Sequence, residues 1–183
     1  MTPGERWRLF VALRVPPAVA DQLAQVARAS LPPRTPVRWV DPADLHLTLW
    51  FIGPLPPTEL PNVAARVARA AGTVAPFACR IEGAGAFGHG KARAVWVGLA
   101  EPGAGTVAAL AAEFDSDDRP HQAHITVCRG GLPAFAGAVA AALGDRPALA
   151  WIATDVEVLR SHPGRRPSYE TVASFSLGPV ASA

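Results

Sequence analysis

The chain contains 183 residues, half of them hydrophobic, and carries a formal net charge of +2. The length suits one domain or two closely packed lobes, and no apolar run reaches the roughly 18–20 residues that a membrane-spanning helix needs. The small net charge does not by itself indicate a nucleic-acid partner, so the evidence for a partner must come from a specific site.

Strand-like and helix-like segments alternate through the first half of the chain. The expected elements are a strand at residues 7–13, a helix from 16 to about 30, a short strand at 37–40, a strand within 44–53 and a helix ending near 71. Prolines open the first helix, and Thr58 is a candidate N-cap of the second. The strand within 44–53 reads DLHLTLWFIG.

The second half repeats this order and then adds longer strands. The expected elements are strands at 77–87 and 93–99, a helix at 106–114, a strand within 122–131, a helix at 133–143, and strands at 149–161 and 169–177. Because the strands come as hairpins, we expect an α+β fold with antiparallel sheets. The repeated order predicts a bilobal, duplicated fold, with two sheets flanked by helices around a central cleft, and residues 1–183 as a single domain of two pseudo-symmetric lobes.

Each half contains one His-x-Thr motif inside an apolar run. Side chains at i and i+2 of a strand project from the same face, about 6.5–7 Å apart, so His46 and Thr48 share one face, as do His124 and Thr126. The residues between them are apolar and point the other way, toward a core. Each motif therefore presents an imidazole and a hydroxyl on a rigid support.

Two such motifs facing one cleft would suit phosphodiester cleavage without a metal. An imidazole with an unperturbed pKa of about 6.5 exchanges a proton near neutrality. One histidine can remove a proton from a nucleophile while the other protonates a leaving oxygen, and the threonine hydroxyls can bind the non-bridging oxygens. A single His-x-Thr motif is common by chance, and its role is then structural. Here two such motifs occur, both in apolar runs and both followed by glycine at a similar distance, at Gly53 and Gly130.

Several stretches together resemble one family. They are RLFVALRVP, VRWVDPADLHLTLWFIG, GAFG followed by ARAVWVGL, AHITVCR, and LRSHPGRRPSYETVASFSL. They are similar to the two-histidine (2H) phosphoesterases, and within these to the bacterial and archaeal RNA 2′,3′-cyclic phosphodiesterases, also called 2′-5′ RNA ligases. The resemblance covers nearly the whole chain.

The resemblance implies roles for five residues. His46 would be the general acid that protonates the departing 3′ oxygen, and His124 the general base that activates water. Thr48 and Thr126 would bind the phosphate, and Arg129 would lie near the reacting water or phosphate. The implied product is a 2′-phosphate end, and no cofactor or metal is expected.

Strict alternation from His124 places Arg129 on the opposite face of its strand. We therefore expect a bulge or a strand end at residues 130–131 that turns Arg129 toward the cleft.

Other residues are weaker candidates. Trp50 falls on the face of His46 and could stack on a nucleobase, although closing the core is the commoner role. Ser161 and Tyr169 flank the segment SHPGRRPSY, which the resemblance places at the cleft rim. In the same segment, His162 and Arg166 fit a solvated hairpin tip better than a site, while Arg165 stays a rim candidate.

A zinc site is disfavoured. His121, His124 and Cys128 have a spacing that could suggest zinc ligands, but positions i and i+3 of a strand face opposite ways.

Cys79 and Cys128 make no disulfide framework and have no C-x-x-C spacing. With no secretory signal in the N-terminal residues, we expect a cytoplasmic monomer with no membrane association and no obligate protein partner.

The sequence is compatible with three functions. The first is hydrolysis of an RNA 2′,3′-cyclic phosphate end or of a cyclic nucleotide. The second is the same fold acting on 2′-5′-linked or small cyclic phosphates. The third is an RNA-end-binding module whose histidines bind without cleaving.

Overall fold

A computed structural model describes residues 5–89, 93–114, 121–130, 132, 134–144 and 149–178. Its strands are β1 (Trp7–Arg14), β2 (Arg38–Trp39), β3 (His46–Leu55), β4 (Phe77–Phe87), β5 (Ala94–Leu99), β6 (His124–Arg129), β7 (Ala150–Ala153), β8 (Asp155–Ser161) and β9 (Tyr169–Ser176). Its helices are α1 (Pro17–Ala29), α2 (Leu60–Ala71), α3 (Gly103–Ala112) and α4 (Ala134–Gly144), with 3-10 turns η1 (Pro42–Asp44) and η2 (Pro57–Glu59).

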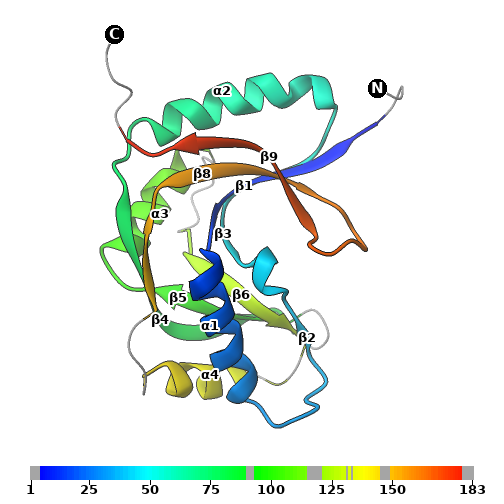
Figure 1. Ribbon diagram of the computed structural model, residues 1–183, viewed down its shortest axis with the longest axis vertical. Coiled ribbons are helices and arrows are strands. Elements are labelled where there is room, and N and C mark those ends of the chain that lie inside the picture. Colours follow the sequence, from blue (N-terminus) through cyan, green and yellow to red (C-terminus); the bar gives the residue numbers. More distant parts are fainter. Residues whose placement is uncertain are drawn as a thin grey trace.

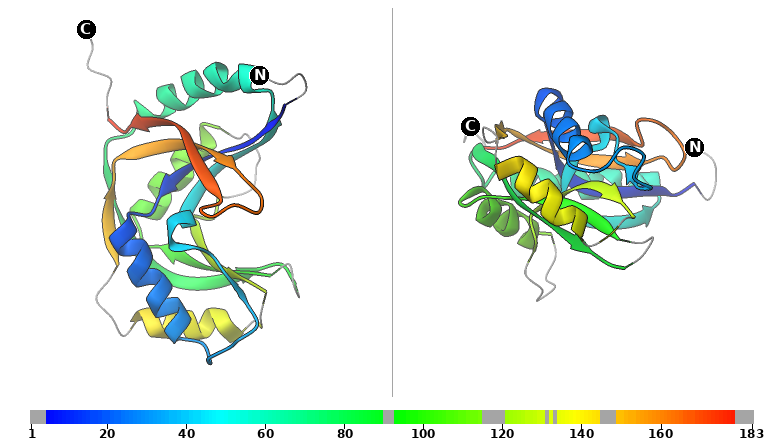
Figure 2. Two further views of the ribbon diagram at one scale, coloured as in Figure 1. Left: turned by 45° about the vertical axis from the view of Figure 1, so that its right-hand side comes forward. Right: turned by 90° about the horizontal axis from the view of Figure 1, so that it is seen from below.

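The strands of the described residues pair antiparallel in the order β7-β4-β5-β6-β3-β1-β8-β9, and β2 pairs with β6. The sheet is strongly curled (Figures 1 and 2). The α+β prediction is confirmed. The two sheets expected from the sequence are instead one, because β3 and β6, the strands that carry the motifs, pair directly at Leu47 and Ile125.

The sheet has two halves, one formed by β2, β4, β5, β6 and β7 and the other by β1, β3, β8 and β9. The strand predicted at residues 149–161 is two strands, one in each half. β7 pairs with β4, whereas β8 pairs with β1 and β9. The chain passes from one half to the other at Thr154, whose carbonyl accepts the Leu177 N–H and whose hydroxyl donates to the Asp155 carboxylate. All four residues of β7 are apolar and β8 begins with an alternating pattern, so both segments read as strand and the sequence does not show that the pairing partner changes.

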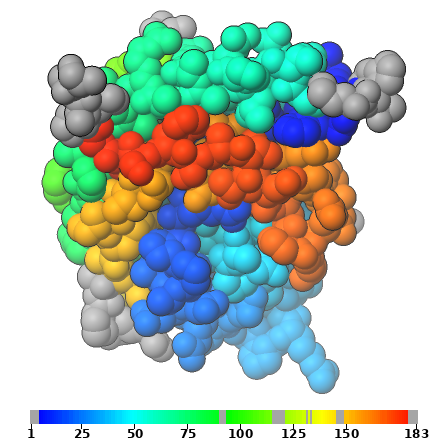
Figure 3. Space-filling model, turned by 45° about the horizontal axis from the view of Figure 1, so that its top comes forward, coloured from blue at the N-terminus to red at the C-terminus, as the bar shows by residue number. Residues whose placement is uncertain are grey.

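The helices pack on both halves of the curled sheet. α2 packs on β8 and β9, while α4 packs on β4 and β5 and also contacts α1. Figure 3 shows the face on which α2 lies along β9. Thr58 does not cap α2, because η2 precedes the helix and puts Glu59 at the N-cap position. No helix in the described ranges is both long and apolar enough to cross a membrane.

Candidate active site

A cavity of about 690 Å³ lies where the two halves of the sheet meet, and both motifs line it. His46 and Thr48 enter from β3, and His124 and Thr126 enter from β6. The four residues that the sequence singled out are therefore brought to one cavity.

The pairing of β3 with β6 explains this meeting. Leu47 lies opposite Ile125, and both side chains are fully buried. Neighbours on antiparallel strands run in opposite order, so His46 is adjacent to Thr126 and His124 is adjacent to Thr48. The alternation of the strands sends all four polar side chains away from the core, which is anchored by the apolar residues between them.

Both imidazoles are oriented in the same way by the backbone. Nδ1 of His46 donates to the carbonyl of Asp44, and Nδ1 of His124 donates to the carbonyl of Gln122, each at 2.7 Å. Because a carbonyl can only accept a hydrogen bond, the proton of each neutral ring is on Nδ1, and Nε2 carries the lone pair. Each histidine can therefore exchange a proton through Nε2.

The surroundings of His46 favour its neutral form. Its ring packs against Phe10 and Tyr169, with centroids 5.0 and 5.1 Å away, and Nε2 accepts a hydrogen bond from the Thr48 hydroxyl at 3.1 Å. Burial lowers the pKa of His46 to about 4, although its bond to Asp44 acts in the opposite direction. His124 has a different setting, with the rings of Phe87 and Trp96 at 4.9 and 6.0 Å.

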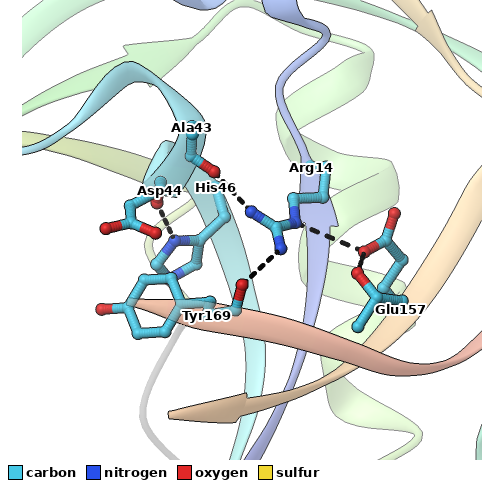
Figure 4. A network of polar contacts seen from close by, with 7 residues as sticks. Arg14, Ala43, Asp44, His46, Glu157 and Tyr169 are labelled. Carbon is cyan, nitrogen blue, oxygen red and sulfur yellow. Dashed lines mark hydrogen bonds and ion pairs between the residues drawn. The ribbon is translucent and has the colours of Figure 1, made fainter. Parts of the chain in front are cut away.

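Arg14 ties the elements around His46 together (Figure 4). Its guanidinium donates to the carbonyls of Ala43 and Tyr169 and to the carboxylate of Glu157, the last at 3.3 Å. It therefore connects η1, β8 and β9.

The Asp44 side chain adds a second tie to the same region. This buried carboxylate accepts the Ser168 N–H, at 2.9 and 3.0 Å from its two oxygens, while the Asp44 carbonyl orients His46. One residue thus fixes both the imidazole and the loop that leads into Tyr169.

A bulge follows each motif threonine. The pairing of β3 with β1 passes from Thr48 to Trp50 over one step of β1, which leaves Leu49 as the extra residue. The pairing of β6 with β5 passes from Thr126 to Cys128, which leaves Val127 as the extra residue. A bulge reverses the alternation of the residues beyond it.

The bulges decide which later side chains face the cavity. Phe51 and Arg129, each five positions after a motif histidine, both line it. Of the bulge or strand end expected at residues 130–131, the strand end is present, since β6 ends at Arg129, but the bulge that turns Arg129 inward lies earlier, at Val127. Gly130 has a φ of +87° and Gly53 a φ of +84°, a backbone conformation that glycine adopts without strain.

The prediction that Trp50 faces the cleft is wrong. Because of the bulge at Leu49, Trp50 stacks on Phe114, with ring centroids 5.7 Å apart and planes at 4°, under the guanidinium of Arg66. Phe51 takes the cavity position and is 77% exposed. The bulge arises from pairing with β1 and leaves no signal in the motif itself.

Ser161 and Tyr169 line the cavity, as expected from the sequence. Arg8, Phe10 and Phe87 also line it and were not anticipated, since they come from neighbouring strands whose register only the tertiary structure defines.

His162 is not among the cavity residues, and its Nε2 lies 2.6 Å from the Glu170 carboxylate.

Burial raises the pKa of Cys128 to about 11, which leaves it a thiol. Within the part of the chain that the structure describes, no three His, Cys, Asp or Glu side chains form a group that could hold a metal.

The comparisons with known proteins place the chain in a family. Residues 15–165 match the 2′-5′ RNA ligase superfamily. The chain belongs to this superfamily. A protein from Bacillus subtilis (strain 168), described as an RNA 2′,3′-cyclic phosphodiesterase, is 26% identical over 188 residues, which cover 96% of this chain and 99% of the relative.

Two further relatives have the same description. The protein from Thermus thermophilus is 34% identical over 140 residues, covering 69% of this chain and 70% of the relative. The protein from Geobacillus stearothermophilus is 34% identical over 161 residues, which are 82% of this chain. The chain spans only 50% of that relative's length.

Solved structures of other proteins share the fold. TT0787 of Thermus thermophilus is 28% identical with a TM-score of 0.68, covering 96% of this chain and 100% of its own. The complex of E. coli LigT with ATP is 24% identical with a TM-score of 0.70, covering 96% of this chain and 99% of its own.

Proposed function

We propose that this superfamily member is a metal-independent RNA 2′,3′-cyclic phosphodiesterase that produces a 2′-phosphate. The observation that supports this most directly is the cavity in which two imidazoles and two threonine hydroxyls meet on directly paired strands. The names of the relatives support the same reaction.

In the proposed reaction, His124 Nε2 accepts a proton from water as the water oxygen attacks phosphorus. The bond from phosphorus to the 3′ oxygen breaks, and that oxygen takes a proton from His46 Nε2. The hydroxyls of Thr48 and Thr126 and the guanidinium of Arg129 bind the non-bridging oxygens, where negative charge develops.

The lowered pKa of His46 makes substrate binding part of this mechanism. The pKa is about 4 in the free protein, so the ring is neutral there near pH 7. A phosphate anion in the cavity favours the charged ring and raises this pKa, so the substrate itself would promote protonation of the acid. In the free protein, the neutral ring of His46 also suits the opposite assignment, with His46 as the base and His124 as the acid.

Two exposed aromatic rings at the cavity support a nucleoside substrate. Phe51 is 77% and Phe87 41% exposed, and both line the cavity. Exposed aromatic side chains stack on the bases of splayed RNA ends.

We also infer that residues 1–183 form a single domain of two pseudo-symmetric lobes. The bulge directly after each motif threonine and the cavity residue at the fifth position after each histidine support a repeated unit.

The decisive experiment incubates the purified protein with 2′,3′-cyclic AMP and with RNA ending in a 2′,3′-cyclic phosphate, in the presence of a chelator. We expect a 2′-phosphomonoester from both, identified by phosphorus NMR. A 3′-phosphate would reverse the leaving-group assignment. Selective turnover of 2′-5′-linked or small cyclic phosphates would favour the second candidate function, and tight binding without product would favour the end-binding module.

A further inference from the structure

A groove continues from the active-site cavity along the loop between β8 and β9. It has a volume of about 470 Å³ and shares Val40, Arg129 and Tyr169 with the active-site cavity. We call it the basic groove because four arginines line it: Arg38, Arg129, Arg165 and Arg166.

The four groove arginines differ from other arginines of the chain in their ion pairs. Arg14, Arg80 and Arg160 each form an ion pair with a glutamate. Among the described residues, none of the four groove arginines forms an ion pair with an acidic side chain. The two aspartates of the groove already accept backbone hydrogen bonds, Asp44 from Ser168 and Asp41 from Ala43.

Two of the groove arginines are placed unfavourably for an empty groove. Arg38 of β2 lies directly opposite Arg129 of β6 in the strand pairing. Like charges at directly opposed positions destabilise a sheet. An anion bound between them would remove this repulsion, and a phosphodiester is such an anion.

Another cavity near His46 has the opposite charge. It measures about 610 Å³ and is lined by Asp21, Asp155 and Glu157 and by Asp41, which also lines the basic groove, with Arg14 as its one basic residue. Arg14 is already paired with Glu157. A polyanion leaving the active site would be repelled by this cavity and attracted by the basic groove.

We propose that the basic groove binds the RNA strand that precedes the cyclic phosphate, so that an oligonucleotide is a better substrate than a free cyclic nucleotide. This inference rests on the proposed function. A 2′,3′-cyclic phosphate is the 3′ end of its strand, and the strand continues only in the 5′ direction. Half-buried Trp39, beside Arg38 in the groove, supplies a surface on which a base can stack.

The test compares kcat/KM for a 5′-extended oligonucleotide ending in a cyclic phosphate with kcat/KM for the matching 2′,3′-cyclic nucleotide. We expect the wild-type protein to prefer the oligonucleotide by about 10-fold or more, since each stacked base and each bound phosphate adds binding energy. In the triple variant Arg38→Ala, Arg165→Ala, Arg166→Ala, this preference should largely disappear. The dependence of log kcat/KM on log salt should also become shallower by about 0.7 for each phosphate that the variant no longer binds.

Arg69→Ala is the matched control, because Arg69 is exposed near the end of α2 and lies outside the groove lining. It changes the net charge as one groove substitution does and should leave the preference unchanged. Thermal unfolding of each variant verifies that the protein is folded.

Equal efficiency of the wild-type protein on the two substrates would overturn the inference and leave the proposed function intact. So would an unchanged preference in the folded triple variant, or a loss of preference in Arg8→Ala alone, which would place the strand at Arg8 in the cavity lining instead. If the wild-type protein hydrolyses neither substrate, the proposed function fails and this inference fails with it.

Discussion

Strands β3 and β6 carry the same motif in two different environments. In both, the histidine donates Nδ1–H to the carbonyl two residues earlier, a bulge follows the threonine, and the fifth residue after the histidine lines the cavity. His46, however, lies between Phe10 and Tyr169, and burial there lowers its pKa to about 4. Repeated backbone geometry presents both imidazoles, whereas their surroundings come from different parts of the chain.

The largest effect should come from removing either imidazole. His46→Gln and His124→Gln should each lower kcat by about 10²- to 10⁴-fold, the usual contribution of a general acid or base. The assay is turnover of a cyclic-phosphate RNA. His89→Gln is the matched control, since His89 is exposed and does not line the cavity. Full activity in both motif variants would remove the basis of the mechanism.

The threonines should contribute less to kcat than the histidines, and only one of them should affect the titration of His46. Thr48→Val and Thr126→Val remove a hydroxyl with little change of shape, and each should lower kcat by about 10- to 10³-fold, as expected for the removal of one oxyanion donor. Thr48→Val should also change the titration of His46, because its hydroxyl bonds Nε2. A proton NMR titration of His46 in both variants measures this difference. An identical titration in the two would show that the hydrogen bond has no influence.

The buried environment of His46 predicts a pH dependence of stability. Its pKa is about 4 in the folded protein, below the usual 6.5, so the unfolded chain binds the proton more readily. The stabilisation from neutral His46 is present above pH 6.5 and is lost as pH falls toward 4, amounting to on the order of 2–3 kcal/mol. Denaturant unfolding from pH 7 to 4, compared with His46→Gln, measures it. A loss of the same size in the variant would assign the effect to other groups.

The bulge at Leu49 separates the roles of two adjacent aromatic residues. Trp50→Ala should lower the free energy of unfolding by about 2–4 kcal/mol because its ring packs on Phe114, with KM unchanged. Phe51→Ala should leave stability unchanged and raise KM by an amount equivalent to about 1–3 kcal/mol, the value of one stacked base. Denaturant unfolding and steady-state kinetics on both variants test this. The reverse pattern would place Trp50 in the site.

The smallest expected effects are on stability, and they differ between Asp44 and Gln122, whose carbonyls orient the two imidazoles. Asp44→Ala leaves the Ser168 N–H without its acceptor and should lower the free energy of unfolding by about 1–3 kcal/mol. Gln122→Ala should cost less than about 0.5 kcal/mol, since Gln122 is exposed and contributes only its carbonyl to His124. Equal costs in denaturant unfolding would mean that the link from Asp44 to the β8–β9 loop carries no stability.

The sequence by itself determined the α+β class, the approximate positions of the helices and strands, and the two pairs His46–Thr48 and His124–Thr126. These are local properties, because the period of a strand sets which residues share a face. Leu47 and Ile125, the apolar residues within these pairs, point to the opposite face and are buried in the core.

Only the tertiary structure decided which further residues join the site. The bulges at Leu49 and Val127 arise from the register with β1 and β5, and they exchange Trp50 for Phe51 and bring in Arg129. The lowered pKa of His46 likewise depends on burial by rings from distant parts of the chain. Register and burial are set by contacts between segments far apart in sequence, so no single stretch of the chain encodes them.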